Sequence, residues 1–294
     1  MRALHLDSGR EMRGGQWQAL RLVEGLHQEG LDVTLLTPSG SPLMIKARSL
    51  GLDVRPLRLP AVYRLSRQAD LVHAHDARSH TLAAALSPAP LVVSRRVAFP
   101  LRSRWKYRRA RRYAAVSQYV KRVMMDGGVP EDKISVVYDG VPLREPVPGG
   151  DVVVAPASSD PLKGTALARE ATHRAGVDLL LSRDLEFDLE TAALFLYLTS
   201  SEGLGSAVLM AMAAGVPVIA SHVGGLPEII RHQQNGWLAE NAPEPVADAI
   251  RNLLADRALA QRLAASGRQT VAEKFSLNQM IHNTLTLYRQ VLSC

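Results

Sequence analysis

The chain has 294 residues, which is enough for two domains of ordinary size that each bury a core. A hydrophobic fraction of 47% and a mean hydropathy near zero exclude a disordered chain and favour a soluble globular protein. The formal net charge of +7 is unevenly placed, because twelve Lys and Arg but no Asp or Glu lie between Ala77 and Met125, which leaves −5 for the rest. This segment predicts an anionic partner, with nucleic acid, anionic lipid and a phosphorylated substrate as candidates.

Three features of the sequence bear on its compartment. The first ten residues lack the apolar stretch of a signal peptide, and the longest apolar run, residues 207–220, is too short to span a bilayer. The single cysteine, Cys294, has no partner for an intramolecular disulfide, which fits a reducing compartment. We therefore expect a cytoplasmic protein, with peripheral attachment to the inner face of the cytoplasmic membrane as a further expectation from the basic segment.

The first half of the chain alternates between strand-like and helix-like segments. We expect strands at residues 2–6, 32–36, 53–57, 70–75, 91–94, 113–116 and 134–138. Between them we expect helices that include residues 16–28, 42–50 and 78–86. Such alternation predicts an open parallel sheet covered on both faces, with ligands beyond the carboxyl ends of the strands.

Residues 145–150, E-P-V-P-G-G, have the composition of a linker, and a second α/β series follows them. We expect its strands at residues 151–154, 177–181, 194–198, 216–220 and 235–238, and its helices at residues 206–214, 243–256 and 258–274. The predicted domains are therefore residues 1–145 and residues 146–275. A last helix is expected within residues 276–294 and is expected to cross back to the first domain.

The most informative stretch runs from Leu194 to Gly225. A buried strand, a glycine loop, an Ala- and Met-rich helix and a second strand form a parallel βαβ pattern. A glycine-flanked helix start presents unpaired N–H groups that suit a phosphate, and Glu202 lies at its mouth. For one glycine loop alone, the alternative is an ordinary turn with a solvated carboxylate.

This stretch resembles the donor-binding motif of the family 4 (GT4) retaining glycosyltransferases, whose GT-B fold has two Rossmann-like domains and a cleft between them. The family's glycine loop is matched by Glu202, Gly203, Leu204 and Gly205, and its later G-G-x-x-E turn by residues 224–228. The resemblance implies that Glu202 contacts the donor sugar. The family's second Glu, which contacts the nucleotide ribose, falls on Met210.

Other motifs of the family follow the same order along the chain. Gly14 and Gly15 resemble first-loop glycines that approach the donor phosphate, and His75 resembles a strand-end histidine near the reacting sugar. Lys163 matches the lysine that holds the diphosphate, whereas Ser158 falls near the place of the family's arginine. Residues 115–117 and 134–141 match two further signatures, with Asp139 in place of the usual Asn. The glycines and the histidine also have a purely structural interpretation.

The second domain is abridged relative to the family. Between the helix after Lys163 and the strand at residues 194–198 there is only one strand and an acidic stretch, residues 184–190. Three of its carboxylates, those of Asp184, Glu186 and Asp188, suggest a metal site, but we expect a solvated turn because the family's fold needs no metal. We expect no cofactor beyond the nucleotide sugar.

The resemblance implies retaining transfer of a sugar from a nucleotide-diphosphate sugar to a hydroxyl of a glycan or a lipid-linked, lipopolysaccharide-type acceptor. Because an arginine and a glutamate of the motif are absent, a weakened or inactive GT-B protein that binds an anionic partner or supports another transferase stays open. Nucleic-acid binding is weaker, since no recognition motif accompanies the charge.

The basic residues are densest between Arg95 and Arg112. We expect this segment to form a helix whose charges surround it and attract an anionic membrane surface together with a phosphorylated acceptor. Trp105 and Tyr107 are expected to add contacts at headgroup depth. The alternative is a solvated face that serves solubility. The residues concerned are Arg102, Arg104, Lys106, Arg108, Arg109, Arg111 and Arg112.

Overall fold

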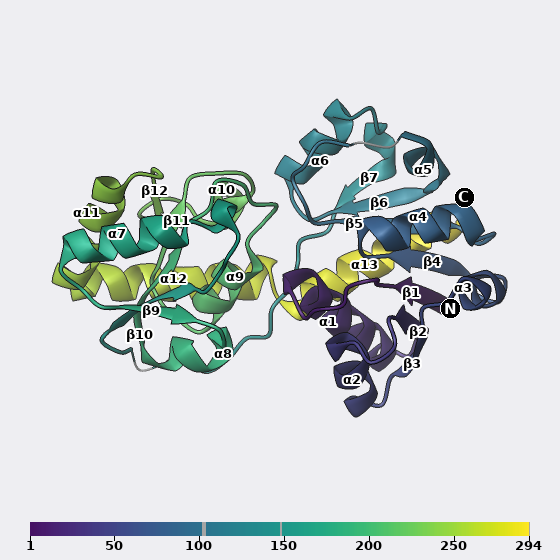
Figure 1. The fold of residues 1–294 in the computed structure, drawn as a ribbon, viewed down its shortest axis with the longest axis horizontal. Coiled ribbons are helices and arrows are strands. Elements are labelled where there is room, and N and C mark those ends of the chain that lie inside the picture. Colours follow the sequence, from purple (N-terminus) through teal and green to yellow (C-terminus); the bar gives the residue numbers. More distant parts are fainter. Residues whose placement is uncertain (102–103, 148, 294) are drawn as a thin grey trace. The chain divides into compact units, whose positions relative to one another are not determined.

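The computed structural model describes residues 1–101, 104–147 and 149–293, and the chain forms two compact α/β units (Figure 1). The first unit comprises Met1–Asp139 and Leu277–Cys294, and the second comprises Gly140–Ser276. The division falls shortly before residues 145–150, where we placed the linker. Arg102, Cys294 and one linker residue, Pro148, lie outside the described residues.

The first unit contains a seven-stranded parallel sheet in the order β3-β2-β1-β4-β5-β6-β7. The order reverses between β1 and β4, so ligands are expected beyond the carboxyl ends of these two strands. His5 of β1 is in register with His73 of β4. The strands are β1 (Arg2–Leu6), β2 (Asp32–Thr37), β3 (Asp53–Pro56), β4 (Leu71–Ala74), β5 (Leu91–Arg95), β6 (Arg112–Ala115) and β7 (Ile134–Val136).

Helices of the first unit cover its sheet, and the last helix of the chain contributes to its core beside α1 (Figure 1). α1 begins at Gly14, so both glycines of the predicted loop are its first residues. α3, a short helix that begins with Leu59-Pro60 and buries Val62 and Leu65, was not among the predicted elements. The helices are α1 (Gly14–Gln28), α2 (Pro42–Ser49), α3 (Leu59–Ser66), α4 (Ala77–Leu86), α5 (Arg104–Arg109), α6 (Gln118–Asp126), η1 (Glu131–Lys133) and α13 (Leu277–Leu292).

The basic segment does not form the single helix that we predicted. α5 ends at Arg109, and Arg112 already belongs to β6. Tyr113 is fully buried in that strand and stacks on Tyr107 at a ring-centroid distance of 5.7 Å. Burial of an aromatic strand residue therefore overrides the helical preference of the arginines.

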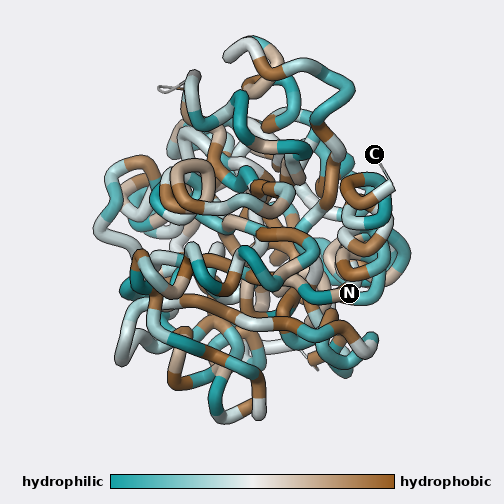
Figure 2. Tube along the Cα trace, turned by 90° about the vertical axis from the view of Figure 1, so that its right-hand side faces the viewer, coloured by the Kyte–Doolittle hydropathy of each residue, from teal (hydrophilic) through white to brown (hydrophobic). Residues whose placement is uncertain are grey.

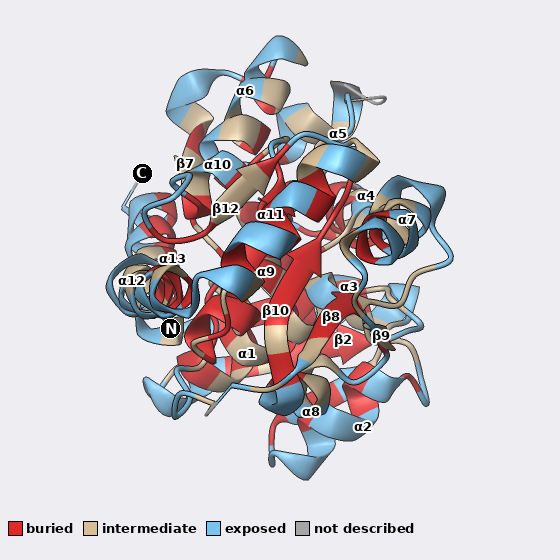
Figure 3. Ribbon diagram, turned by 90° about the vertical axis from the view of Figure 1, so that its left-hand side faces the viewer, coloured by how far each residue is buried: buried red, intermediate tan, exposed pale blue. Residues whose placement is uncertain are grey.

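The second unit contains a five-stranded parallel sheet in the order β12-β11-β10-β8-β9, which reverses between β8 and β10. Its central strands are buried, whereas α7 and α11 expose one face each (Figure 3). The strands are β8 (Val152–Pro156), β9 (Leu179–Ser182), β10 (Ala192–Tyr197), β11 (Val218–Ser221) and β12 (Trp237–Ala239). The helices are η2 (Pro161–Lys163), α7 (Thr165–Ala175), α8 (Leu185–Asp188), η3 (Leu189–Thr191), α9 (Ser206–Ala213), α10 (Leu226–Ile229), α11 (Pro243–Ala255) and α12 (Arg257–Lys274).

The acidic stretch at residues 184–190 is helical rather than the turn that we predicted, but its acidic residues are exposed or half-buried and so remain in contact with solvent. Asp184 caps α8 by accepting a hydrogen bond from the backbone N–H of Phe187, and η3 follows directly. Glu186 forms an ion pair with Arg144 at 2.9 Å. These contacts give the carboxylates of Asp184 and Glu186 structural roles.

None of the helices that the structure describes is both long enough and apolar enough to cross a membrane. Hydrophobic and hydrophilic stretches alternate along the trace (Figure 2), as expected for units that bury one face of each element.

Candidate functional site

Two loops meet where the strand order of the second sheet reverses. Lys163 ends the loop after β8 and Glu202 lies in the loop after β10, and their side chains form an ion pair with a Nζ–Oε2 distance of 2.7 Å although 39 residues separate them. The carbonyl of Leu162 accepts hydrogen bonds at 2.9 Å from the N–H of Ser200 and the hydroxyl of Thr199, which holds the loops together. The topology of the sheet therefore brings together the two charged residues that the sequence singled out.

Tyr197 completes this cluster from the end of β10. Its hydroxyl lies 3.2 Å from the Lys163 ammonium and donates to Glu202, whose other carboxylate oxygen accepts from the N–H of Gly203 at 3.0 Å. Burial raises the pKa of Tyr197 well above its usual value, and the Glu202 carboxylate raises it further. The side chain of Lys163 is 34% exposed to solvent and that of Glu202 is 14% exposed. Both charged groups therefore remain within reach of a ligand.

The start of α9 lies next to Glu202. Gly205 precedes the helix with a φ of 107°, no side chain among the described residues caps the helix, and its first turn contains no acidic residue. Ser206 and Ala207 are half-buried, whereas Gly203 and Leu204 are buried. The first N–H groups of a helix have no intrahelical acceptor and form its positive end. This end of α9 is suited to bind a phosphate group.

Gly224 and Gly225, which follow β11, pack against the backbone of the Glu202 loop. The N–H of Gly225 donates to the carbonyl of Glu202 at 3.2 Å. A Cβ atom at Gly224, where φ is 58°, would lie 2.1 Å from the same carbonyl oxygen. The pair therefore acts on the site through the position of the loop.

We expect Gly224→Ala to displace Glu202 and to weaken ligand binding at this site as well as stability. The matched control is Gly176→Ala, because Gly176 has a φ of 71° and a Cβ there would meet nothing within 4 Å. Both variants carry the left-handed backbone strain of about 1–2 kcal/mol, but only the first has the clash. Urea unfolding and ligand titration of both variants test this. Equal losses in the two would contradict it.

The two departures from the GT4 pattern have defined places. Met210 lies in α9 and is half-buried, so a side chain at this position reaches the surface. Ser158 lies in the loop after β8, where its hydroxyl accepts from the N–H of Asp160 at 3.1 Å. Neither residue supplies the charge of the residue that the family motif has there.

In the first unit three histidines form a buried cluster at the ends of β1 and β4. Nδ1 of His5 lies 2.9 Å from Nε2 of His75, and His73 lies 2.6 Å from the Tyr288 hydroxyl of α13 and 2.8 Å from that of Ser94. Burial lowers the pKa of His5 to about 3 and lowers the pKa values of His73 and His75 well below normal. The cluster is therefore neutral near pH 7.

His75 keeps one ring nitrogen, Nδ1, without a hydrogen-bond partner among the described residues. One ring nitrogen from each of His5, His73 and His75 lies within 4.8 Å of the other two, close enough to hold a metal ion. The hydrogen bond between His5 and His75 and the two hydrogen bonds of His73 are sufficient to explain the cluster as a structural network, without a metal ion. His75 is therefore the member of the cluster whose ring keeps an unused hydrogen-bonding position, although that nitrogen is buried.

Gly14 is exposed and Gly15 is half-buried at the first turn of α1. A Cβ at Gly15 would meet nothing within 4 Å, so the packing of this unit does not require a glycine there. Asp139, which replaces the family's Asn, forms a buried ion pair with Arg96 at 2.9 Å. A cation at this place explains why a carboxylate is accommodated.

Three residues of these clusters, Tyr197, His5 and Tyr288, were not predicted from the sequence. Tyr197 is the last residue of β10, and His5 lies one position before the end of β1. A search for polar side chains at the carboxyl ends of strands next to a reversal of strand order would have identified both. Tyr288 gave no such signal, because its contact with His73 depends on how α13 packs.

Two units with all-parallel sheets and covering helices define the GT-B class of fold. HepE from Anabaena, solved in complex with UDP and glucose, has the same fold, with a TM-score of 0.85, 16% identity, and coverage of 99% of this chain and 100% of that one. Residues 12–145 match the family "Glycosyltransferase Family 4", and residues 152–270 match "Glycosyl transferases group 1". The chain therefore belongs to the GT4 family of glycosyltransferases.

Relatives with named activities match parts of the chain. N-acetyl-alpha-D-glucosaminyl L-malate synthase of Bacillus anthracis is 37% identical over 105 residues, 35% of this chain and 28% of that protein. GDP-mannose-dependent alpha-(1-6)-phosphatidylinositol monomannoside mannosyltransferase of Mycobacterium tuberculosis is 44% identical over 75 residues, 25% of this chain and 20% of that protein. The chain thus matches less than a third of the length of each of these two relatives.

Proposed function

We propose that the protein is a retaining glycosyltransferase that moves a sugar from a nucleotide-diphosphate sugar to a hydroxyl of a glycan or a lipid-linked, lipopolysaccharide-type acceptor. The observation that carries the proposal is the meeting of Lys163, Glu202 and the uncapped start of α9 at the reversal of the second sheet. An ammonium group and helix N–H groups suit a diphosphate, and a carboxylate suits sugar hydroxyls.

Each residue has a separate task in this proposal. Lys163 and the first N–H groups of α9 stabilise the charge that develops on the departing diphosphate. Glu202 accepts hydrogen bonds from the sugar hydroxyls and so orients the ring. Tyr197 positions both charged side chains through its hydroxyl. In the first unit, we assign His75 as a sugar contact through its Nδ1, and Gly14 and Gly15 as a close approach to the donor phosphate.

Relatives and structural neighbours support a nucleotide sugar but differ in its base. HepE was solved with UDP, whereas the mycobacterial mannosyltransferase is named as GDP-mannose-dependent and acts on a phosphatidylinositol derivative. The donor of this chain is therefore proposed only as a class. The lipid-linked acceptor rests on the resemblance of the sequence and on the name of that relative.

A thermal-shift screen with UDP-, GDP- and ADP-sugars, followed by an assay for release of the nucleoside diphosphate, tests the proposal. We expect at least one donor to raise the melting temperature and to be turned over. Binding without turnover, with glycan and lipid-linked acceptors present, would favour the alternative of an inactive GT-B protein, which the changes at Met210 and Ser158 support. A complete absence of binding would contradict the donor site itself.

Introducing the family's second carboxylate should strengthen donor binding. We expect Met210→Glu to lower the Kd for the nucleotide about tenfold or more, because a charge-assisted hydrogen bond to the ribose contributes roughly 1.5–3 kcal/mol. Met210→Leu is the matched control, since it keeps the size and offers no acceptor. Calorimetric titration measures both. An unchanged Kd in a Met210→Glu protein of normal stability would show that the ribose does not reach α9.

A further inference from the structure

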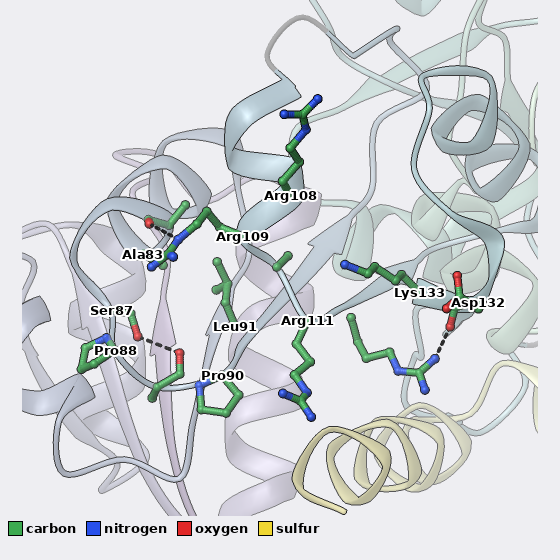
Figure 4. A pocket seen from close by; sticks show the side chains of 14 residues that line it. Ala83, Ser87, Pro88, Pro90, Leu91, Arg108, Arg109, Arg111, Asp132 and Lys133 are labelled. Atoms are coloured by element: carbon green, nitrogen blue, oxygen red, sulfur yellow. Dashed lines mark hydrogen bonds between the residues drawn. The ribbon is translucent and has the colours of Figure 1, made fainter. Parts of the chain in front are cut away.

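A basic pocket lies in the first unit, away from the crevice at the end of β1 and β4. Its volume is about 580 Å³, within the range typical of sites for small ligands. Leu91 and Pro90 lie between Arg109 on one side and Arg111 and Lys133 on the other (Figure 4). The cations that line it are Arg108, Arg109, Arg111, Arg112 and Lys133, against a single acidic residue, Asp132.

The location of the pocket follows from the topology of the sheet. It is lined by the residues that directly precede or begin β5, β6 and β7. In a parallel sheet these amino ends share one edge, which is opposite to the carboxyl edge where ligands of the fold bind. The basic segment is thereby divided, because Arg95 and Arg96 lie at the carboxyl end of β5. The pocket is therefore separate from the site expected at the strand reversal.

The hydrogen bonds of Arg109 and Arg112 do not neutralise the charge of these two side chains. Arg109 donates to the carbonyl of Ala84 at 3.3 Å, and Arg112 donates to the carbonyl of Asp132, so both bonds orient a guanidinium without neutralising it. The nearby Glu131 pairs with Lys121 at 2.8 Å. Several cations around a concave, partly apolar floor attract an anion and hold it by charge-assisted hydrogen bonds.

We propose that this pocket binds the phosphoryl group of an anionic ligand, which is either a soluble phosphate ester or a phospholipid headgroup. Arginine is the side chain best suited to phosphate, because its planar guanidinium donates two parallel hydrogen bonds. Trp105 on α5 is 50% exposed and is available to a lipid surface, whereas Tyr107 packs against His80 and Tyr113. This proposal does not rest on transferase activity.

The test compares two variants that lose equal charge. Arg108→Ser/Arg109→Ser removes two cations of the pocket, and Arg48→Ser/Arg64→Ser removes two exposed arginines elsewhere in the same unit. Both are made in a Lys163→Ala background, so that pyrophosphate binding at the proposed donor site is weakened and is the same in the two variants. The probes are inorganic pyrophosphate, measured by calorimetry, and phosphatidylcholine vesicles with and without phosphatidylglycerol, measured by co-sedimentation. Equal melting temperatures of the variants serve as the check on folding.

We expect the pocket variant to bind at least one of the two probes at least tenfold more weakly than the control variant does. Binding of the probe should also decrease as the salt concentration rises, because the Debye length falls to about 3 Å at 1 M. Loss of pyrophosphate binding identifies a soluble ester as the source, and loss of binding confined to phosphatidylglycerol vesicles identifies a headgroup. Equal binding by the two variants to both probes would overturn the proposal. Preference for a generic nucleic-acid duplex over both probes would overturn it as well.

Discussion

Replacing Lys163 with alanine should lower the rate of donor turnover by about 100-fold or more, in the range found when one charge-stabilising group is removed from an active site. The ammonium group is lost from beside the departing diphosphate, and Glu202 loses the ion pair that positions it. Glu202→Gln should have a comparable effect, because the amide keeps the shape of the side chain without its charge.

The matched control for Lys163→Ala is Lys121→Ala. The Lys121 ammonium pairs with Glu131 at 2.8 Å in the first unit, and its loss should leave turnover unchanged. The rates are measured as release of nucleoside diphosphate at saturating donor, and circular dichroism checks the folding of each variant. Unchanged turnover in both Lys163→Ala and Glu202→Gln would exclude this donor site.

The second large effect is expected in the pH dependence of stability. His5, His73 and His75 are buried, and burial holds their pKa values below the ordinary value, to about 3 for His5. Unfolding therefore takes up protons below about pH 6.5, and stability falls as the pH decreases. At pH 5.5 each neutral histidine should lower the free energy of unfolding by roughly 1 kcal/mol relative to pH 7.5, so the three together should lower it by a few kcal/mol.

Two other groups modify this slope. Burial lowers the pKa of His80 to about 4, which adds to the loss in the same direction. Burial raises the pKa of Asp7, which acts in the opposite direction but involves at most one proton. The net effect is therefore loss of stability at acidic pH.

Urea unfolding at pH 7.5 and pH 5.5 measures this loss. Trp237→Phe leaves Trp17 and Trp105 as fluorescent reporters of the first unit alone. His5→Gln should reduce the pH dependence by one histidine's share, whereas His27→Gln, which removes an exposed histidine, should not change it. A free energy of unfolding that is equal at the two pH values would contradict neutral burial of the cluster.

The sequence predicted most of the elements and the two charged residues of the candidate site. The alternation of strand-like and helix-like segments was sufficient to predict the parallel sheets. The glycines around Glu202 were sufficient to predict where α9 begins. Lys163 and Glu202 were chosen separately, each from its own motif. The reversal of strand order between β8 and β10 then explains why they meet.

Other features depend on packing between distant segments and were not predictable from local pattern. α5 stops at Arg109 because Tyr113 is buried in the next strand. The histidine cluster requires β1 and β4 to pair in register and α13 to place Tyr288 beside them. The pocket at the amino ends of β5, β6 and β7 could not be predicted, because the local sequence does not show which strands are neighbours in the sheet.

A calorimetric titration of the wild-type protein and Lys163→Ala with the donor selected by the thermal-shift screen tests the central claim most directly. The claim is that the ion pair and the start of α9 hold a nucleotide-diphosphate sugar. We predict saturable binding by the wild type and at least tenfold weaker binding by Lys163→Ala, since a charge-assisted hydrogen bond contributes roughly 1.5–3 kcal/mol. Equal affinities in two folded proteins would show that the donor, if bound, is held elsewhere.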